Sequence, residues 1–307
     1  MKTLVRLLLV AASLVLVVPY SHAQRQLGKK KGPTSKLYLA ETKGDGEVTN
    51  EGRTFAPKQA TAFDAPGTVL ETKANSYQAF VYSNGTGMFV DENTRVEVDR
   101  FVQEPFRPDR DLNAPAEPSI SQSDVFVARG QVAICTGTLV SGSTMNYSTP
   151  HAAVNIRGGK IAIRSDGDTS TVYLLDGDAT VKSGTKDVGG TLLKPGEQAV
   201  IRPGPTGQPP SITVGPIDRD VMSSLDEKVN VACNAKKTVT FEAIEVLAER
   251  GLEASETPVS DEPEATPGAP GAAGSDTEQV IVARPNLPAA PPATIVVSPD
   301  RIGPGGQ

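Results

Sequence analysis

Turn-forming residues recur at short intervals through the middle of the chain, between residues 37 and 203. The clearest turn sequences are Ser83-Asn84-Gly85-Thr86-Gly87, Asp166-Gly167-Asp168, Asp176-Gly177-Asp178 and Lys194-Pro195-Gly196-Glu197. These residue types are favoured there because each tolerates or fixes the backbone angles of a turn. β-rich runs with alternating side chains lie between them, at residues 79–82, 95–99, 125–128 and 161–164. No helical pattern intervenes, so residues 37–203 are predicted to form an all-β domain of many short strands, as a sandwich, a roll or a short solenoid.

One stretch within this domain carries four prolines, at positions 105, 108, 115 and 118. Proline cannot donate to a strand ladder, so residues 103–123 are predicted to leave the sheet as a surface excursion. The excursion would divide the strands into two unequal groups.

The hydrophobic period changes after residue 204. Four apolar residues recur every four positions and therefore share one helical face: Ile217, Val221, Leu225 and Val229. A second apolar segment comprises Phe241, Ile244 and Leu247 and ends before Gly251. Residues 204–251 are therefore predicted to form two short helices that pack on the β domain or on each other.

The N-terminus has the pattern of an export signal. Lys2 and Arg6 precede an apolar run over residues 7–18. Ser21-His22-Ala23 follows this run and has small residues at the two positions that a signal peptidase recognises. Residues 1–23 are therefore predicted to be a cleavable signal peptide. The apolar run is short for a membrane span, and no comparable run follows it. We expect an exported protein, periplasmic or at the cell surface, with no transmembrane helix after signal removal.

The two ends of the mature chain differ from its middle in composition. Residues 24–36 are basic and are interpreted as a flexible leader. Residues 252–307 are rich in proline, glycine, alanine and acidic residues, without a sustained apolar period. Such a segment buries too little apolar surface to offset its ordering entropy, so a disordered acidic tail is predicted there.

The distribution of charge excludes one class of partner. The full chain has a formal net charge of −6, and removing the two positive charges of the signal leaves −8. The tail accounts for −6 of this, from eight acidic residues and two arginines. The rest of the mature chain is nearly neutral and lacks the basic field that nucleic-acid binding requires.

Several motifs of the β domain, taken in order, resemble the FecR domain family. They are Thr149-Pro150, Ile156-Arg157-Gly158, the run over residues 171–181 that contains Gly177, and Leu193-Lys194-Pro195-Gly196-Glu197. The resemblance covers most of residues 37–203 and implies a FecR-like β roll or solenoid-like domain. Family members that regulate iron transport place a cytoplasmic anti-sigma segment and a membrane helix ahead of this domain. Here an export signal precedes it, so the sigma-factor role is not carried over.

Arg157 is the most distinctive residue of these motifs. Its guanidinium offers five donors, enough to bind several carbonyl groups or a carboxylate across neighbouring strands. Gly158 and Gly159 let the chain adopt positive φ or approach another backbone closely, and Pro150 suits a strand start. We interpret Arg157 as a structural latch. The alternative is a ligand-binding arginine, but the residues after Gly159 have a strand pattern instead of the helix expected behind a phosphate loop.

The chain has few of the residues that catalysis or metal binding would use. His151 is the only histidine after the signal, and no Gly-x-Ser-x-Gly elbow accompanies it, so it is interpreted as an incidental residue. The Asp-Gly-Asp sequences do not continue to the distal glutamate of a calcium loop, and two distant cysteines with one histidine make no zinc site. No catalytic residue, cofactor or metal site is predicted. A paired-carboxylate enzyme acting on carbohydrate remains an alternative.

The two cysteines, Cys135 and Cys233, would lie in an oxidising compartment after export. Joined, they would tie the β domain to the helical segment and stabilise the fold by about 4 kcal/mol in the chain-entropy model. Two buried free thiols are the alternative.

These inferences predict an exported, non-catalytic protein that acts as a binding or scaffolding module in the cell envelope. The expected partner is an envelope protein or a polysaccharide. One alternative is a signalling accessory that docks onto a membrane partner by adding a strand at an exposed edge. The other is the carbohydrate-active enzyme.

Overall fold

The structure is a computed structural model that describes residues 35–104, 106, 115–184, 187, 189–205, 208, 210–247 and 277–286. The predicted signal peptide, nearly all of the leader and most of the tail lie outside the described residues.

The described chain is almost entirely β-structure, as the turn spacing predicted, with a single α-helix among the described residues. The strands are β1 (Lys36–Lys43), β2 (Gly46–Asn50), β3 (Arg53–Phe55), β4 (Thr61–Asp64), β5 (Thr68–Thr72), β6 (Tyr77–Tyr82), β7 (Gly87–Val90), β8 (Arg95–Gln103), β9 (Ser121–Thr136), β10 (Thr144–Ser148), β11 (Ala153–Ser165), β12 (Ser170–Lys182), β13 (Thr191–Leu193), β14 (Glu197–Arg202), β15 (Ser211–Pro216), β16 (Val239–Leu247) and β17 (Thr277–Pro285). The helix is α2 (Arg219–Ala235), and a short 3₁₀ turn (Lys236–Thr238) follows it.

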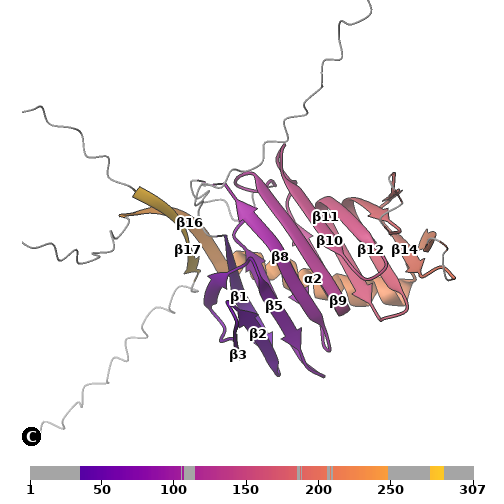
Figure 1. Ribbon diagram of the computed structural model, residues 1–307, viewed down its shortest axis with the longest axis horizontal. Helices are drawn as coiled ribbons and strands as arrows, with labels where there is room; N and C mark the ends of the chain where they lie inside the picture. Colours follow the sequence, from indigo (N-terminus) through magenta and orange to yellow (C-terminus); the bar gives the residue numbers. More distant parts are fainter. Residues whose placement is uncertain are drawn as a thin grey trace, which may run out of the picture. The chain divides into compact units, whose positions relative to one another are not determined.

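A 15-stranded sheet folds over on itself into two packed layers (Figure 1). We call the layer with β2, β3, β5, β8, β10 and β13 the front layer, and the layer with β1, β4, β6, β7, β14 and β15 the back layer. β9, β11 and β12 run through both layers, pairing with one set of strands in their first half and another in their second. The roll or solenoid-like detail implied by the family resemblance is not confirmed.

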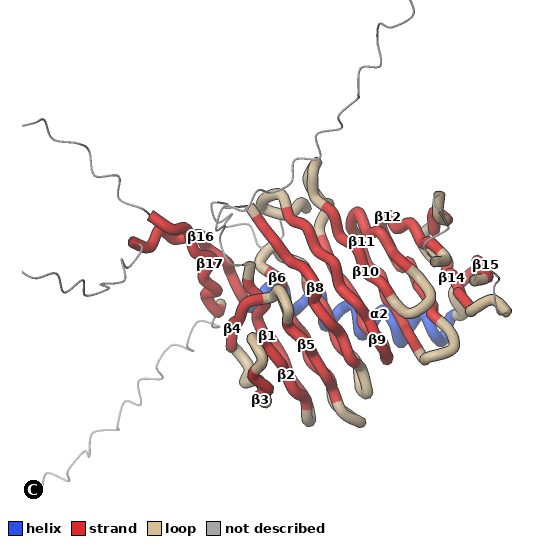
Figure 2. Tube along the Cα trace, viewed as in Figure 1, coloured by secondary structure: helices blue, strands red, loops and turns tan. Residues whose placement is uncertain are grey.

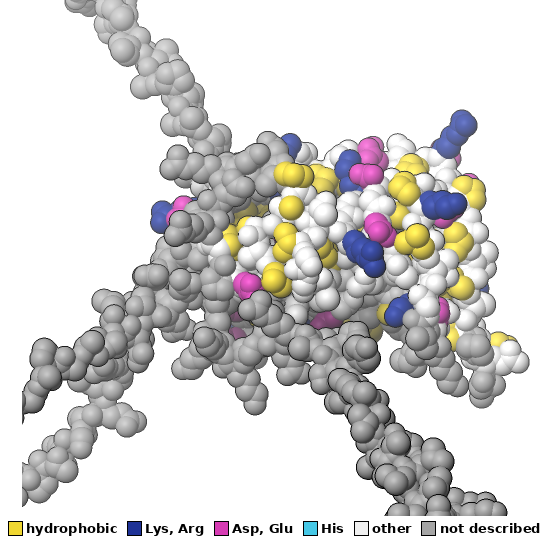
Figure 3. Space-filling model, turned by 90° about the horizontal axis from the view of Figure 1, so that it is seen from above, with side chains coloured by type: hydrophobic (Ala, Val, Ile, Leu, Met, Phe, Trp, Pro, Cys, Tyr) yellow, Lys and Arg dark blue, Asp and Glu magenta, His cyan; other side chains and the backbone are white. Residues whose placement is uncertain are grey.

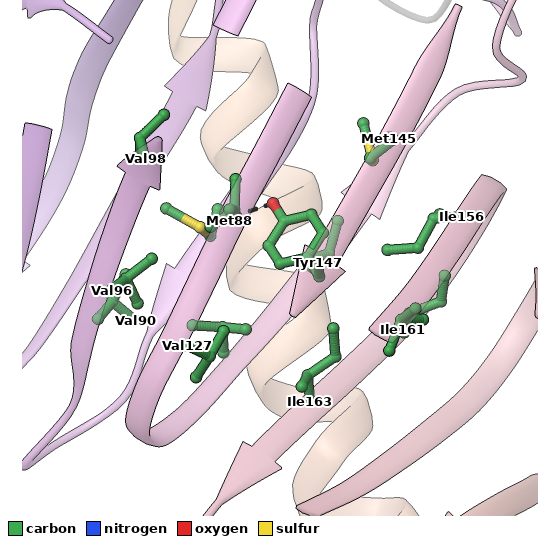
Figure 4. Close-up of a cluster of buried hydrophobic side chains, with 14 of the residues drawn as sticks. Met88, Val90, Val96, Val98, Val127, Met145, Tyr147, Ile156, Ile161 and Ile163 are labelled. Carbon is green, nitrogen blue, oxygen red and sulfur yellow. Dashed lines mark hydrogen bonds between the residues drawn. The ribbon is translucent and has the colours of Figure 1, made fainter. Parts of the chain in front are cut away.

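The main hydrophobic core lies between the two layers. Alternating side chains of the front layer, such as Val154 and Ile156, are buried against residues of the back layer, such as Ile134 and Ile161. The Tyr147 hydroxyl crosses this core and donates a hydrogen bond to the sulfur of Met88, at 3.8 Å (Figure 4). Burial raises the pKa of Tyr147, so this hydroxyl stays protonated and remains a donor.

Helix α2 covers the outer face of the back layer (Figure 2). Leu225, Val229 and Ala232 are buried against small and aromatic residues of the sheet, which include Ala133 and Tyr173. The four-residue period in the sequence therefore predicted this helix and two residues of its buried face, Leu225 and Val229. The other two residues of the predicted stripe do not belong to that face, because Ile217 lies before the helix and Val221 is exposed. Among the described residues, no helix is long and apolar enough to span a membrane.

The structure joins Cys135 of β9 to Cys233 of α2 in a disulfide bond, with their Cα atoms 5.2 Å apart. Of the two arrangements that the sequence left open, the structure has the disulfide. The bond fixes the C-terminal part of the helix to the central strand of the sheet.

The second predicted helix is wrong, because residues 239–247 form strand β16 and pair antiparallel with β17. The spacing of Phe241, Ile244 and Leu247 fits a helix. In the structure, however, Val239 and Phe241 are buried, whereas Thr240 and Glu242 are partly exposed. Burial of every second residue is the pattern of a strand. The partner strand, residues 277–285, lies within the segment predicted to be a disordered tail. A strand partner so distant in sequence leaves no local signal, so propensity alone favoured the helix.

Two further expectations need correction. β15 occupies residues 211–216, inside the segment predicted to be helical, and it extends the β domain beyond residue 203. The Pro-rich excursion does not divide the strands, because β8 and β9 on either side of it pair directly with each other.

The disulfide yields a stability prediction. Replacing both cysteines by serine should lower the free energy of unfolding by about 4 kcal/mol, because the bond closes a long loop in the unfolded chain. Urea denaturation of the double variant beside the oxidised wild type measures the change. An unchanged midpoint would show that the bond contributes nothing to stability.

The β16–β17 pair gives a second prediction. Ile281 of β17 is fully buried against Tyr38 and Val81. Ile281→Ala should therefore destabilise the protein by about 2–4 kcal/mol, as expected for a buried aliphatic truncation. Val282→Ala, at a half-buried position of the same strand, is the matched control and should cost clearly less. If neither substitution measurably lowered the free energy of unfolding, the result would contradict the packing of β17 on the β domain.

Candidate functional site

The candidate site lies where β11 changes partner. Residues 153–156 pair with β10 in the front layer, whereas residues 159–165 pair with β9 in the back layer. β12 accompanies β11 through this change, and the register between them shifts on each side of Gly158 and Gly159. The predicted Arg157-Gly158 motif is therefore the point at which two strands bend from one layer into the other.

Glycines make this bend sterically allowed. Gly159 and Gly177 lie opposite each other in β11 and β12, with φ of 111° and 94°. A Cβ on Gly159 would lie 2.2 Å from the Asp176 carbonyl oxygen, and one on Gly177 would lie 2.1 Å from the Gly158 carbonyl oxygen. The expectation that the paired glycines permit positive φ and close backbone approach is met. Asp176-Gly177-Asp178, predicted to be a turn between strands, is instead a bend inside β12.

An open pocket of about 940 Å³ lies at this bend. We call it the bend pocket. Its lining comes from the β9–β10 loop with the strand residue on each side of it, from the bent strands β11 and β12, and from one proline. These residues are Pro115, Thr136, Gly137, Thr138, Leu139, Val140, Ser141, Gly142, Ser143, Thr144, Asn155, Ile156, Arg157, Gly158, Gly159, Asp176, Gly177 and Asp178. Most of these side chains are hydroxyl, amide or charged groups. The pocket can therefore offer donors and acceptors of hydrogen bonds and charges of both signs.

Arg157 does not form the predicted latch. Its side chain is exposed, and its guanidinium makes no hydrogen bond or ion pair with any described residue. Strand alternation explains this, because Val154 and Ile156 point into the core and Arg157 therefore belongs to the outer face. Only its backbone carbonyl bridges segments, accepting the Leu139 N–H at 3.0 Å. The guanidinium is left available to the pocket.

Two aspartates line the same pocket. One carboxylate oxygen of Asp178, Oδ1, is buried and has no hydrogen-bond partner among the described residues. Asp176 is exposed, and neither aspartate forms an ion pair with Arg157. Opposite charges thus line one cavity without neutralising each other. Within the described part of the chain, no group of three or more residues is gathered that could bind a metal ion.

A buried carboxylate, Glu117, positions the loop that forms the pocket wall. It is 6% exposed, and its Oε1 accepts the Val140 N–H at 3.0 Å while its Oε2 accepts the Ser121 hydroxyl at 2.6 Å. The backbone beside it bonds the same loop, since Thr138 donates to Pro115 at 2.7 Å. Sequence reasoning missed Glu117, because the surrounding prolines indicated a surface excursion.

Residues 68–180 match the family model FecR, described as "FecR protein". Over these residues the chain is similar to a FecR domain. The matched range contains every residue that lines the bend pocket, so the pocket lies within the FecR-like part of the chain. No curated protein matches the sequence.

Two crystal structures of a candidate anti-sigma factor from Parabacteroides distasonis ATCC 8503, at 2.50 and 1.65 Å resolution, are similar to the chain. Each has a TM-score of 0.36 and 12% sequence identity over 51% of this chain. The match covers 62% and 63% of those two chains. Similarity at this level supports no argument about function.

The other residues of the motifs that resemble the FecR family do not line the pocket. Thr149 and Pro150 form the turn between β10 and β11, where the Thr149 hydroxyl accepts the Ala152 N–H at 2.9 Å. In the same turn, His151 is hydrogen-bonded through Nε2 to the Gly167 carbonyl at 2.7 Å. Pro195 and Gly196 form the turn between β13 and β14. These contacts are structural.

A row of polar side chains on the outer face of the front layer leads to the pocket. The Asn146 side chain donates to the Asp124 carboxylate, and the Asn155 side chain donates to the side-chain oxygen Oδ1 of Asn146, each at 2.9 Å. These three residues are register neighbours on β9, β10 and β11. Because Asn155 also lines the bend pocket, the row and the pocket form one continuous polar surface.

The bend yields a prediction with a matched control. Gly159→Ala should destabilise the FecR domain by clearly more than Gly167→Ala, although both glycines have positive φ. A Cβ at Gly167 meets nothing within 4 Å and pays only about 1–2 kcal/mol for the left-handed backbone, whereas one at Gly159 collides with backbone. Thermal and urea unfolding of the two variants give the comparison. Equal costs would mean that the strands do not approach closely at the bend.

Proposed function

We propose that this protein is an exported, non-catalytic binding module of the cell envelope, and that it binds its partner in the bend pocket. The observation that carries the proposal is the pair of opposite charges, Arg157 and Asp178, that line one open pocket without bonding each other. A charged group without a partner at a cavity is available to a ligand. The export signal in the sequence supports location outside the cytoplasm.

The lining of the pocket favours binding over catalysis. Neither an imidazole nor a thiol belongs to it, and the charged groups are one guanidinium and two carboxylates. The match of residues 68–180 to the FecR family model is compatible with a binding role. On the face seen in Figure 3, acidic and basic side chains are interspersed, without the large basic field of a nucleic-acid-binding surface.

The test is a pull-down on the mature protein. Purified cell-wall fragments and a detergent extract of envelope membranes are offered to the wild type and to the Arg157→Gln/Asp178→Asn double variant. Loss of at least tenfold in the amount bound is expected for the variant, because both charges at the pocket are removed. The matched control is Arg202→Gln/Asp168→Asn, which changes an exposed arginine and an exposed aspartate outside the pocket. Equal recovery by wild type and pocket variant would refute the proposal.

One observation favours a second candidate function, a signalling accessory that adds a strand to a membrane partner. Among the described residues β15 pairs only with β14, and Val214 on it is 38% exposed. Strand addition at such an edge is a common mode of docking. Val214→Lys should then abolish capture of a membrane protein, because a charge at an edge strand opposes pairing, while Arg157→Gln leaves it intact. The reverse pattern supports the bend pocket.

A further inference from the structure

The bend pocket contains complementary charges on two neighbouring strands. Asp178 pairs in register with Gly158, the neighbour of Arg157. Strand spacing therefore places the Cα atoms of Arg157 and Asp178 about 6 Å apart. Their side chains differ in environment, since Arg157 is exposed while Oδ1 of Asp178 is buried.

We propose that the ligand of the bend pocket is a zwitterion with an ammonium and a carboxylate on one small group, that is, an α-amino-acid head group. This inference rests on the proposed function and names its ligand class. The head group belongs either to a free amino acid or to the end of an amide-linked chain.

Each end of such a ligand satisfies one group of the pocket. The Asp178 carboxylate lines the pocket and accepts no hydrogen bond from a described residue, and an ammonium supplies three N–H donors. The Arg157 guanidinium only donates, and a carboxylate accepts from it in a bidentate, charge-assisted arrangement. A ligand with one charge leaves one of these groups without a partner, and a neutral sugar leaves both.

The rest of the lining is compatible with a close-fitting head group. Gly158, Gly159 and Gly177 line the pocket with backbone alone. Thr138, Ser141 and Thr144 also line the pocket, and a hydroxyl can act as both donor and acceptor.

The experiment is a titration of the mature protein by calorimetry, with NMR as a second readout. The probes are four forms of alanine. Alanine itself carries both charges, alanine amide carries the ammonium alone, N-acetylalanine carries the carboxylate alone, and N-acetylalanine amide carries neither charge. Alanine should bind at least tenfold more tightly than any of the other three. Comparable affinity for all four probes, or no binding of alanine at millimolar concentration, overturns the proposal.

Variants assign each charge of the ligand to one residue. Arg157→Gln should bind alanine and alanine amide equally, because the carboxylate no longer has a partner, and should still prefer alanine to N-acetylalanine. Asp178→Asn should show the opposite loss of preference. The controls Arg202→Gln and Asp168→Asn should keep both preferences. A variant that has lost its structure would lose both preferences together, not only one of them. Loss of the same preferences in Arg157→Gln and in Asp178→Asn would therefore contradict the assignment of one charge to each residue.

A further probe separates the two sources of the head group. Nε-acetyl-lysine presents the same head group at the end of an amide-linked chain; tighter binding than alanine indicates a chain-linked ligand, and equal binding a free amino acid.

The zwitterion proposal and the proposed function can fail separately. If the envelope pull-down depends on Arg157 and Asp178 but the four alanine probes bind alike, only the ligand class is wrong. If the pull-down is independent of both residues, the proposed function is wrong.

Discussion

The contact between the backbones at Gly159 and Gly177 is the constraint on which the rest of the fold depends. Neither position has room for a Cβ, and both backbones have positive φ, so only glycine is accommodated without displacement. With this contact, β11 and β12 stay paired while they pass from the front layer to the back layer. One sheet can then supply both faces of its own core.

The bend also explains why the polar pocket occurs where it does. Alternation normally separates buried apolar from exposed polar residues along a strand, but a register shift interrupts it. At the shift, Asp178 keeps a buried oxygen without a partner, and Arg157 stays on the outer face beside it. The loop over these residues is held by Glu117, a buried carboxylate supplied by the Pro-rich excursion. The same irregularity that lets the sheet fold over therefore produces the candidate binding site.

The back layer needs a cover because its strands are apolar on both faces. Ala133 and Cys135 alternate with Ile134 along β9, so one set faces the core and the other faces helix α2. Small side chains at Ala133 and Ala162 let the helix approach closely, and the Cys135–Cys233 bond holds it there. The β16–β17 pair covers the neighbouring part of the same face, against Tyr38 and Val81.

Local patterns in the sequence determined much of this protein. They predicted the β character of residues 37–203 and three of the four clearest turns. They also predicted the helix with Leu225 and Val229 on its buried face and the paired glycines at a close backbone contact. Each depends on properties of a few neighbouring residues, such as φ preference or side-chain period. Only the tertiary structure decided that Asp176-Gly177-Asp178 bends a strand, that residues 239–247 pair with a strand in the acidic tail, and that Arg157 lies free beside Asp178. These outcomes depend on partners far away in sequence, and a strand's partner, layer and register are set by contacts that no local pattern records.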